Sequence, residues 1–304
     1  LGLVSLDEPF ARLLTQGMVL NHIYYRHPAG GRRTYFNPAD VETRGGVPVL
    51  IADGEPVMHD GLGTMSKSKG NGVDPSRLVE EFGADTARLF MMFTAPPEQS
   101  LEWSDEGVQG AFRFIRRLWK AVHDLVSQGP LPAADFAALD AEQKALRRLT
   151  HETLAKVTDD IGRRHTFNTA IAATMELLNA ATRVPTAQAQ GRSVVREACE
   201  VIVLTLSPII PHVTHALWQA LGHATALIEE PWPKPDPAAL VRDAIELVVQ
   251  VNGKLRGRVT VAAAAPEEAV RAAALADENV RRFMEGKPVR KLVIVPGKLV
   301  NIVV

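Results

Sequence analysis

Apolar residues recur every three or four positions through the middle of the chain, which is the spacing of an amphipathic helix. This period predicts helices over residues 104–126, 140–162, 166–183, 192–206 and 213–221. The connections between these stretches are short and polar. We therefore expect neighbouring helices to run antiparallel and to form one bundle.

The stretch before this bundle has a mixed character. We predict a helix within residues 6–17, followed by a short buried strand at residues 17–20. Between about residues 22 and 61, glycine pairs and prolines separate short extended pieces. This pattern predicts a small β-rich insertion with little core of its own.

Two short helices follow the insertion. Asp74 and Pro75 begin the first, because Asp accepts backbone N–H bonds at an N-cap and Pro needs none at the first helical position. Gly83 ends this helix. Asp85 is expected to cap the second helix, which carries an apolar side that includes Leu89.

The apolar period changes from 3.6 to 2 after residues 231–244, a proline-rich segment that we interpret as a stiff linker. Two strands then flank Asn252 and Gly253, a pair that tolerates the positive φ angles of a type I′ hairpin turn. Two helical stretches and two more strands complete a ββααββ module at residues 245–304.

Positive charge is concentrated in this last module. The whole chain has a net charge of −1 and a charged fraction of 23%, which is ordinary for a globular protein. Residues 245–304 contain ten Lys and Arg against six Asp and Glu. On the second strand Lys254, Arg256 and Arg258 alternate, so we expect them on one face. That face suits RNA binding, or it protects an edge strand from aggregation.

The helix over residues 104–126 carries a second basic face. Its apolar stripe is predicted to be Val108, Phe112, Ile115, Trp119, Val122 and Val126. The opposite face holds four cations, Arg113, Arg116, Arg117 and Lys120. Such a face either is simply solvated or contacts the phosphates of a nucleic acid, and both interpretations stay open.

Several classes of protein are disfavoured by composition. Cys199 is the only cysteine, which excludes a disulfide framework and a Cys-rich zinc site. His212 and His215 lack a third ligand nearby, so we interpret them as packing or surface residues and expect no metal site. There is no apolar stretch of membrane-spanning length and no signal peptide, which indicates the cytoplasm and no membrane partner. Because the chain begins with Leu1, we expect a fragment of a longer protein.

The segment with the most specific chemistry is residues 63–72, GTMSKSKGNG. It contains two lysines, two serines and three glycines, with one apolar side chain, so an exposed, mobile loop is expected. Lysine is a flexible point charge that suits phosphate oxygens. A solvated basic turn would have a similar composition, and only the neighbouring sequence separates the two interpretations.

This loop, followed by two short helices, resembles the KMSKS region of class I aminoacyl-tRNA synthetases. Thr64 stands at the first lysine of that signature, and Lys67 at the second. Further segments resemble the bacterial leucyl-tRNA synthetases; these are QGMVL (16–20), LEW (101–103), AKVTDDIG (155–162), FNTA (167–170), VNGK (251–254) and VPGK (295–298). The resemblance covers essentially all 304 residues.

The resemblance implies a mainly α, multi-domain chain. Residues 1–95 would be the end of a Rossmann-type catalytic domain, with the insertion as a leucine-specific domain. Residues 96–230 would be an anticodon-binding-type bundle and 245–304 an α+β C-terminal tRNA-binding domain. It implies that the full enzyme uses ATP and Mg²⁺ to make leucyl-adenylate and then charges leucine tRNA. We expect a monomer, with no cofactor bound to this fragment.

The same resemblance implies roles for individual residues. Lys67 would be catalytic, because a lysine that closes on the departing pyrophosphate stabilises the transition state. The ATP-binding set would be Thr64, Met65, Ser66, Lys67, Ser68 and Lys69. The tRNA-binding set would be Arg113, Arg116, Arg117, Lys120, Lys254, Arg256 and Arg258. At Thr64 a hydroxyl replaces an ammonium, so one electrostatic contact is lost or is supplied elsewhere.

Other functions are weighed against this one. An isoleucyl, valyl or methionyl enzyme shares the loop, but the chain has no terminal Cys cluster and ends in a basic ββααββ module. A non-enzymatic tRNA-binding module would not need Lys67, and a purely structural scaffold leaves the local positive charge unexplained. The chain lacks a His-x-Gly-His signature. We therefore expect it to bind tRNA weakly and not to charge tRNA alone.

Overall fold

The computed structural model describes residues 5, 8, 10, 13–28, 31–130, 135–241 and 244–304. The chain divides into two compact units, Leu1–Ala239 and Leu240–Val304. Each unit has a hydrophobic core of its own. Within the described residues, no helix has both the length and the apolar character needed to cross a membrane.

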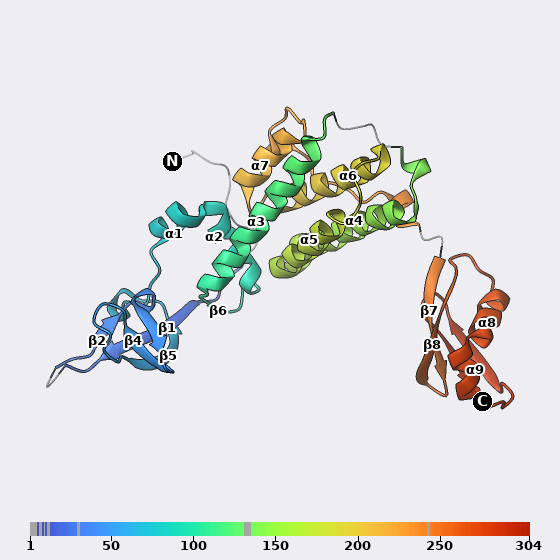
Figure 1. The fold of residues 1–304 in the computed structure, drawn as a ribbon, viewed down its shortest axis with the longest axis horizontal. Coiled ribbons are helices and arrows are strands. Elements are labelled where there is room, and N and C mark those ends of the chain that lie inside the picture. The colour runs from blue at the N-terminus through green and yellow to red at the C-terminus, as the bar shows by residue number, and fades with distance from the viewer. Residues whose placement is uncertain are drawn as a thin grey trace. The chain divides into compact units, whose positions relative to one another are not determined.

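A small sheet begins the first unit (Figure 1). Its central strand β1 (Val19–Arg26) pairs antiparallel with β2 (Thr34–Phe36) and β5 (Met58–Thr64). The short strand β6 (Leu101–Glu102) joins β1 in parallel. A separate hairpin is formed by β3 (Val41–Arg44) and β4 (Val47–Leu50). The β-rich character predicted between residues 22 and 61 is therefore confirmed.

The helix predicted within residues 6–17 is not found where the chain is described. Residues 13–17 contain no helix, and much of the remaining range lies outside the described residues. Leu13 is 84% exposed, so among the described residues there is no surface for the apolar side of such a helix to cover. An amphipathic helix of this length depends on such a surface for its stability.

The two helices after the insertion are α1 (Pro75–Phe82) and α2 (Ala84–Thr94). Asp74 caps α1 as predicted, because its side chain accepts a bond from the backbone N–H of Ser76. The predicted cap at Asp85 is wrong, since α2 begins one residue earlier and has no side-chain cap. Asp85 instead accepts a bond from the N–H of Val213, 2.7 Å away, and so satisfies the start of a distant helix.

The bundle contains α3 (Asp105–Val126), α4 (Ala141–Asp159), α5 (Phe167–Ala181), α6 (Ala189–Leu206) and α7 (Pro211–Ala220) (Figure 1). Helix α4 packs against α5 and α6, while α3 packs against α2, α6 and α7. The five helices predicted from the apolar period are thus confirmed, with small shifts of their ends.

The buried face of α3 differs from the predicted stripe. Its buried residues are Val108, Ala111, Phe114, Ile115, Leu118, Val122 and Leu125. At 100° per residue, this set is rotated by roughly 60° from the predicted stripe. The rotation arises because α3 is covered from several sides by other helices. As a result Trp119, predicted to lie in the core, is 42% exposed.

The proline-rich segment does not stand free of the bundle. The indole N–H of Trp232 donates to the hydroxyl of Thr158 on α4, over 2.8 Å. Asp236 pairs with Arg147 on the same helix at 2.5 Å. Its backbone N–H also donates to Nδ1 of His151, over 3.1 Å. These bonds explain why the segment as far as Ala239 belongs to the first unit.

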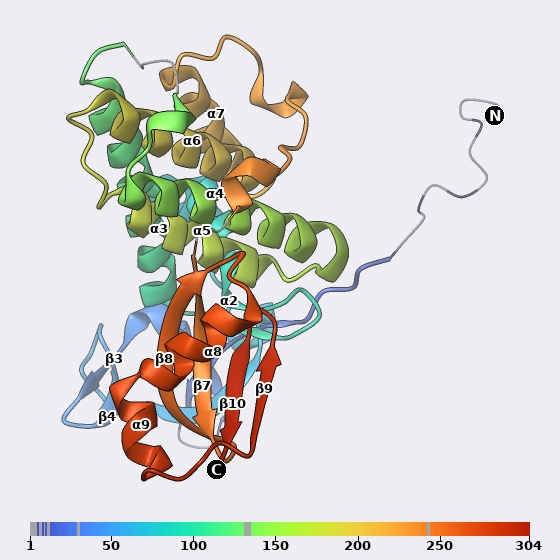
Figure 2. The ribbon, with the colours of Figure 1, turned by 90° about the vertical axis from the view of Figure 1, so that its right-hand side faces the viewer.

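The second unit is a four-stranded sheet with two helices on one face (Figure 2). Its elements are β7 (Ala244–Val251), β8 (Lys254–Ala262), α8 (Glu267–Ala276), α9 (Glu278–Met284), β9 (Lys291–Val295) and β10 (Leu299–Val303). The strand order is β8-β7-β10-β9, with β10 parallel to β7. Asn252 and Gly253 both have positive φ, as the predicted turn requires.

Candidate functional site

Residues 63–72 form a turn at the end of β5. The strand ends at Thr64, and a single 3₁₀ turn follows over Lys67–Lys69. Gly70 closes this turn with a φ of 63°, a conformation that favours glycine. The segment is only partly exposed: Lys67 and Ser68 face solvent, whereas Asn71 is completely buried. The predicted exposure is therefore found for Lys67 and Ser68 but not for Asn71.

Two buried asparagines explain why the turn packs down. The side-chain oxygen of Asn71 accepts a bond from the N–H of Ser66 over 2.9 Å. The amide nitrogen of Asn71 lies 3.4 Å from the carbonyl oxygens of Asn21, Gly63 and Thr64. In return, the Asn21 side chain donates to the carbonyl of Asn71 over 3.1 Å. The sequence reasoning missed both residues.

The rest of the turn is held by the sheet as well. The N–H of Met65 donates to the carbonyl of Val19 on β1 over 3.1 Å. Asn37, which follows β2, donates from its side chain to the carbonyl of Gly72 over 3.0 Å. The backbone of the segment is therefore bonded at both of its ends, while the side chains between them stay available.

Those side chains can bind an anion. Within the described part of the chain, neither Lys67 nor Lys69 has a carboxylate within 4.0 Å. The hydroxyls of Ser66 and Ser68 lie 3.3 Å apart at the same turn. Ammonium groups and hydroxyls fit the oxygens of a polyphosphate. The segment has no carboxylate to offer a cation. Among the described residues, no cluster of three or more Asp, Glu, His or Cys is placed to hold a metal.

The four predicted cations of α3 are all exposed, but they are not equivalent. Lys120 is paired with Asp124 at 2.6 Å, and a guanidinium nitrogen of Arg117 donates to Asn179 on α5. For Arg113 and Arg116 there is no carboxylate within 4.0 Å in the described ranges. Lys120 is thus the cation of this face whose charge is compensated by a carboxylate, while Arg113 and Arg116 have neither a carboxylate nor the amide contact that holds Arg117.

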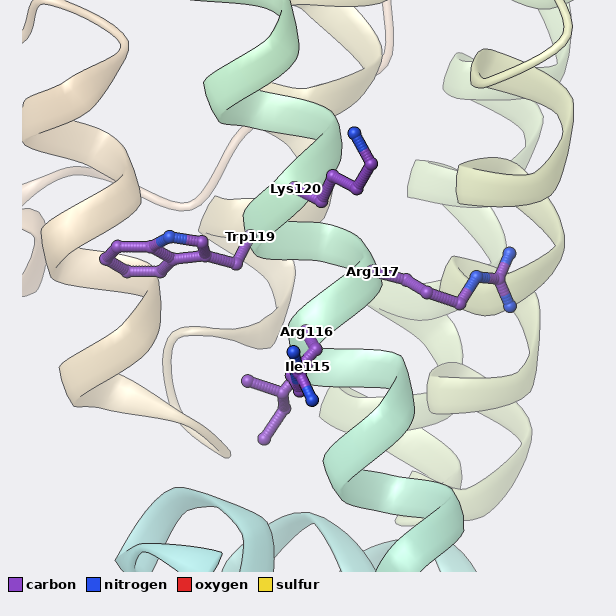
Figure 3. Close-up of a pocket in the computed structure, with 5 residues that line it drawn as sticks. All are labelled: Ile115, Arg116, Arg117, Trp119 and Lys120. Atoms are coloured by element: carbon purple, nitrogen blue, oxygen red, sulfur yellow. The ribbon is translucent and has the colours of Figure 1, made fainter.

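The same helix has a hollow on its surface. The hollow has a volume of about 440 Å³ and is lined by Ile115, Arg116, Arg117, Trp119 and Lys120. Figure 3 shows Trp119 and Arg117 extending to opposite sides of α3. The Trp119 ring lies against that of His123, with 4.6 Å between ring centroids. An aromatic surface is thus present beside the cationic face.

The basic side chains of β8 do not share one face, which corrects the prediction. A bulge lies opposite Val249 and Gln250, so the alternation breaks at Arg256. The Arg256 guanidinium lies 3.9 Å from the ring centroid of Phe283 on α9. Arg258 faces the other side of the sheet and pairs with Glu246 at 2.8 Å. Lys254 is exposed opposite the buried Val251, on the side of Arg256.

A buried carboxylate organises another part of the bundle. Asp160 lies in a π-helical turn, Asp160–Arg164, between α4 and α5. It accepts bonds from the hydroxyl of Thr169 at 2.7 Å, from Arg164 at 2.9 Å and from Lys156. Burial raises the pKa of Asp160, but the bonds from Lys156 and Thr169 outweigh burial and hold the pKa below its usual value. The ionised Asp160 carboxylate therefore holds two exposed cations beside it, Lys156 on α4 and Arg164 in the turn.

The two histidines of α7 differ in their surroundings, since His212 is exposed and His215 is half-buried. His215 accepts a bond at Nδ1 from the N–H of Leu227, over 3.3 Å. This bond ties α7 to the segment that follows it. Its position agrees with the interpretation of His215 as a packing residue.

Comparison with known proteins gives two family matches. The family described as the anticodon-binding domain of tRNA ligase matches residues 143–271. The family described as tRNA synthetases class I (I, L, M and V) matches residues 51–104. The second match contains the turn at residues 63–72, and the first contains most of the helical bundle.

Similar proteins agree with both matches. The leucine--tRNA ligase of Nitrosospira multiformis is 58% identical over 315 residues, which cover 100% of this chain and 36% of that protein. That of Chromohalobacter salexigens is 59% identical, over 99% of this chain and 36% of that protein. The chain therefore spans about a third of the length of these relatives.

A solved structure shows the same likeness. It is the ternary complex of Agrobacterium radiobacter K84 agnB2 LeuRS with tRNA and LeuAMS, with a TM-score of 0.72 and 27% identity. The match covers 79% of this chain and 31% of that one. The sequence similarity to the two leucine--tRNA ligases covers essentially the whole chain, including the sheet, the turn and the bundle. The chain belongs to the leucine--tRNA ligase family of class I tRNA synthetases.

Proposed function

We propose that this chain is the C-terminal portion of a leucine--tRNA ligase and supplies that enzyme with its pyrophosphate-binding turn and with surfaces for tRNA. The observation that carries the proposal is the turn at residues 63–72. It presents Lys67 and Ser68 to solvent on a backbone that is bonded at both ends. A protein that only bound tRNA would have no use for a fixed cationic turn of this kind.

In the first step of the proposed reaction, a carboxylate oxygen of leucine attacks the α-phosphate of ATP. The bond from the α-phosphorus to the bridging oxygen breaks, and pyrophosphate leaves with the negative charge that this bond released. The Lys67 ammonium is placed to neutralise that charge, with donors from Ser66 and Ser68. Interactions that strengthen as charge develops lower the barrier. Lys69 adds a second positive charge close to the turn.

Mg²⁺ would reach the site on the phosphates of ATP and would neutralise part of their charge. The turn offers no carboxylate ligand, so the residues of this chain act on the phosphate oxygens and not on the metal. Thr64 contributes a hydroxyl at the end of β5, where the family signature has a lysine.

In the second step, a terminal ribose hydroxyl of leucine tRNA attacks the carbonyl carbon of leucyl-adenylate, and AMP leaves. We assign the sheet region at about residues 22–61 to a leucine-specific domain and residues 96–230 to an anticodon-binding-type bundle. Residues 245–304 would be the C-terminal tRNA-binding domain. The match of residues 143–271 to an anticodon-binding family supports the second assignment.

Two surfaces are proposed to contact tRNA. On α3, Arg113 and Arg116 are exposed without a carboxylate partner among the described residues, which favours phosphate contacts. In the second unit, Lys254 is exposed near the hairpin turn. Arg258 and Arg256 are engaged with Glu246 and Phe283, so we expect smaller contributions from them.

The test is Lys67→Ala in the intact enzyme, measured by ATP–pyrophosphate exchange. Removing one preorganised contact to developing charge normally costs about 10²–10³-fold in rate. Lys298→Ala, at an exposed lysine of the second unit, is the matched control and should leave exchange unchanged. A loss of less than about tenfold for Lys67→Ala would refute the assigned role. The isolated chain should form no leucyl-tRNA.

A further inference from the structure

We propose that Asn71 is a positioning residue for Lys67, a role that rests on the proposed function of that lysine. Asn71 has no exposed surface and does not face the solvent side of the turn. It therefore acts on the reaction only through the backbone that carries Ser66 and Lys67. Ser66 and Lys67 are consecutive in the sequence, so a shift of the Ser66 backbone moves Lys67 directly.

The first part of the argument is what the Asn71 side chain joins. Its oxygen accepts the N–H of Ser66, five residues earlier, so it spans the 3₁₀ turn over Lys67–Lys69. This bond holds the Met65–Ser66 peptide, which directly precedes the residue pair Ser66–Lys67 at the start of the turn. The Ser66 side chain makes no cap bond at this turn, so the bond from the Ser66 N–H to Asn71 is the side-chain bond that ties the start of the turn to its end.

The second part is why the residue must be an amide. The Asn71 nitrogen faces three carbonyl oxygens at 3.4 Å, while the oxygen of the same side chain accepts a bond. A carboxylate keeps the acceptor but places negative charge against those carbonyls. Alanine supplies neither group. Only an amide has a donor and an acceptor in this geometry.

The third part is that Asn71 is itself held from the strand. Asn21 donates to the carbonyl of Asn71, and its own carbonyl lies near the Asn71 nitrogen. Asn21 is 5% exposed and pairs with Gly63 across β1 and β5. The turn is therefore preorganised by the sheet, so less ordering remains when pyrophosphate develops charge.

The experiment is a double-mutant cycle in the intact enzyme, again read by ATP–pyrophosphate exchange. We expect Asn71→Ala to lower kcat by about 10²-fold, because a misplacement near 1 Å has an effect of that size. The KM for leucine should stay unchanged. In a Lys67→Ala background, Asn71→Ala should cause no further loss, since its effect passes through the missing lysine.

Three further variants sharpen the result. Asn71→Asp keeps the acceptor and loses the donor, so it should not rescue the rate. Asn21→Ala removes the support from β1 and should also be non-additive with Lys67→Ala, and it serves if Asn71→Ala does not fold. Asn301→Ala removes a similar side-chain bond to a backbone N–H in the second unit and should have no effect.

The outcomes separate the two proposals. If Lys67→Ala leaves exchange unchanged, the proposed function of the turn fails. If Lys67→Ala lowers exchange but Asn71→Ala does not, the positioning role alone fails. The positioning role also fails if the losses of the two single variants multiply in the double variant, because Asn71 would then act independently of Lys67.

Discussion

The double variant Arg113→Ala/Arg116→Ala should weaken tRNA binding in a way that depends on salt. Both side chains are exposed on α3, and neither has a carboxylate within 4.0 Å in the described structure. Each is therefore free to neutralise one phosphate. A phosphate contact releases bound counterions, so its contribution falls as salt is raised.

The size of the effect follows from the number of contacts. Each phosphate contact contributes about −0.9 to the slope of log affinity against log salt on a duplex. Raising salt fourfold, from about 50 to about 200 mM, then weakens one contact about 3.5-fold and two contacts about 12-fold. Over this salt range, the factor by which wild-type affinity falls should therefore be about 12 times the factor by which the affinity of the double variant falls.

The assay is tRNA binding to the intact enzyme across that salt range, with Lys120→Ala as the matched control. Lys120 lies on the same face but is paired with Asp124, so its removal should change the slope less. An unchanged slope in the double variant would show that α3 does not contact phosphates. A slope change in Lys120→Ala as large as that of either arginine would refute the ranking by pairing.

Three further predictions concern stability and reactivity. Asp160→Asn should lower the free energy of unfolding by about 3 kcal/mol, because it removes the buried negative charge that pairs with Lys156 and Arg164 and leaves one acceptor oxygen where there were two; urea unfolding measures this. The pKa of Asp160 is lower in the folded state than in the unfolded state, where it is about 3.9. The stability that the ionised Asp160 contributes is therefore present above the unfolded pKa and is lost as pH falls through the folded pKa. Acid unfolding of wild type, compared with that of Asp160→Asn, tests this. Gly257→Ala should destabilise the second unit by about 1–3 kcal/mol in thermal unfolding, because a Cβ there would lie 2.7 Å from the Asp277 carboxylate that caps α9. Burial raises the pKa of Cys199 to about 12, so iodoacetamide should label this thiol only after unfolding.

Features set by neighbouring residues in the sequence could be predicted. Asp74 accepts a bond from the N–H of Ser76 at the start of α1, as predicted from the Asp-Pro pair. Asn252 and Gly253 form the expected turn. In each case the partners lie within three residues of one another, so the sequence already contains the whole interaction.

Features set by partners that are distant in the sequence could not be predicted. Asp85 caps α7 and not its own helix. The N–H group that it accepts belongs to Val213, 128 residues away in the sequence. Trp119 is exposed because of how the surrounding helices cover α3. The bulge at Arg256 depends on the register between β7 and β8, and a shift of one residue reverses the faces. Periodicity alone carries no information about any of these.

The candidate site combines both kinds of feature. The residues to which we assign the chemistry of the turn could be identified from the sequence, because Ser66, Lys67 and Ser68 are adjacent. Its support could not, because a buried asparagine beside glycine looks in sequence like any turn residue. The departure at Thr64 now has a structural context. It is the last residue of β5 and pairs with Leu20, where a β-branched residue fits well. In the signature that the segment resembles, the first lysine would therefore stand at the strand end, whereas Lys67 stands in the turn itself.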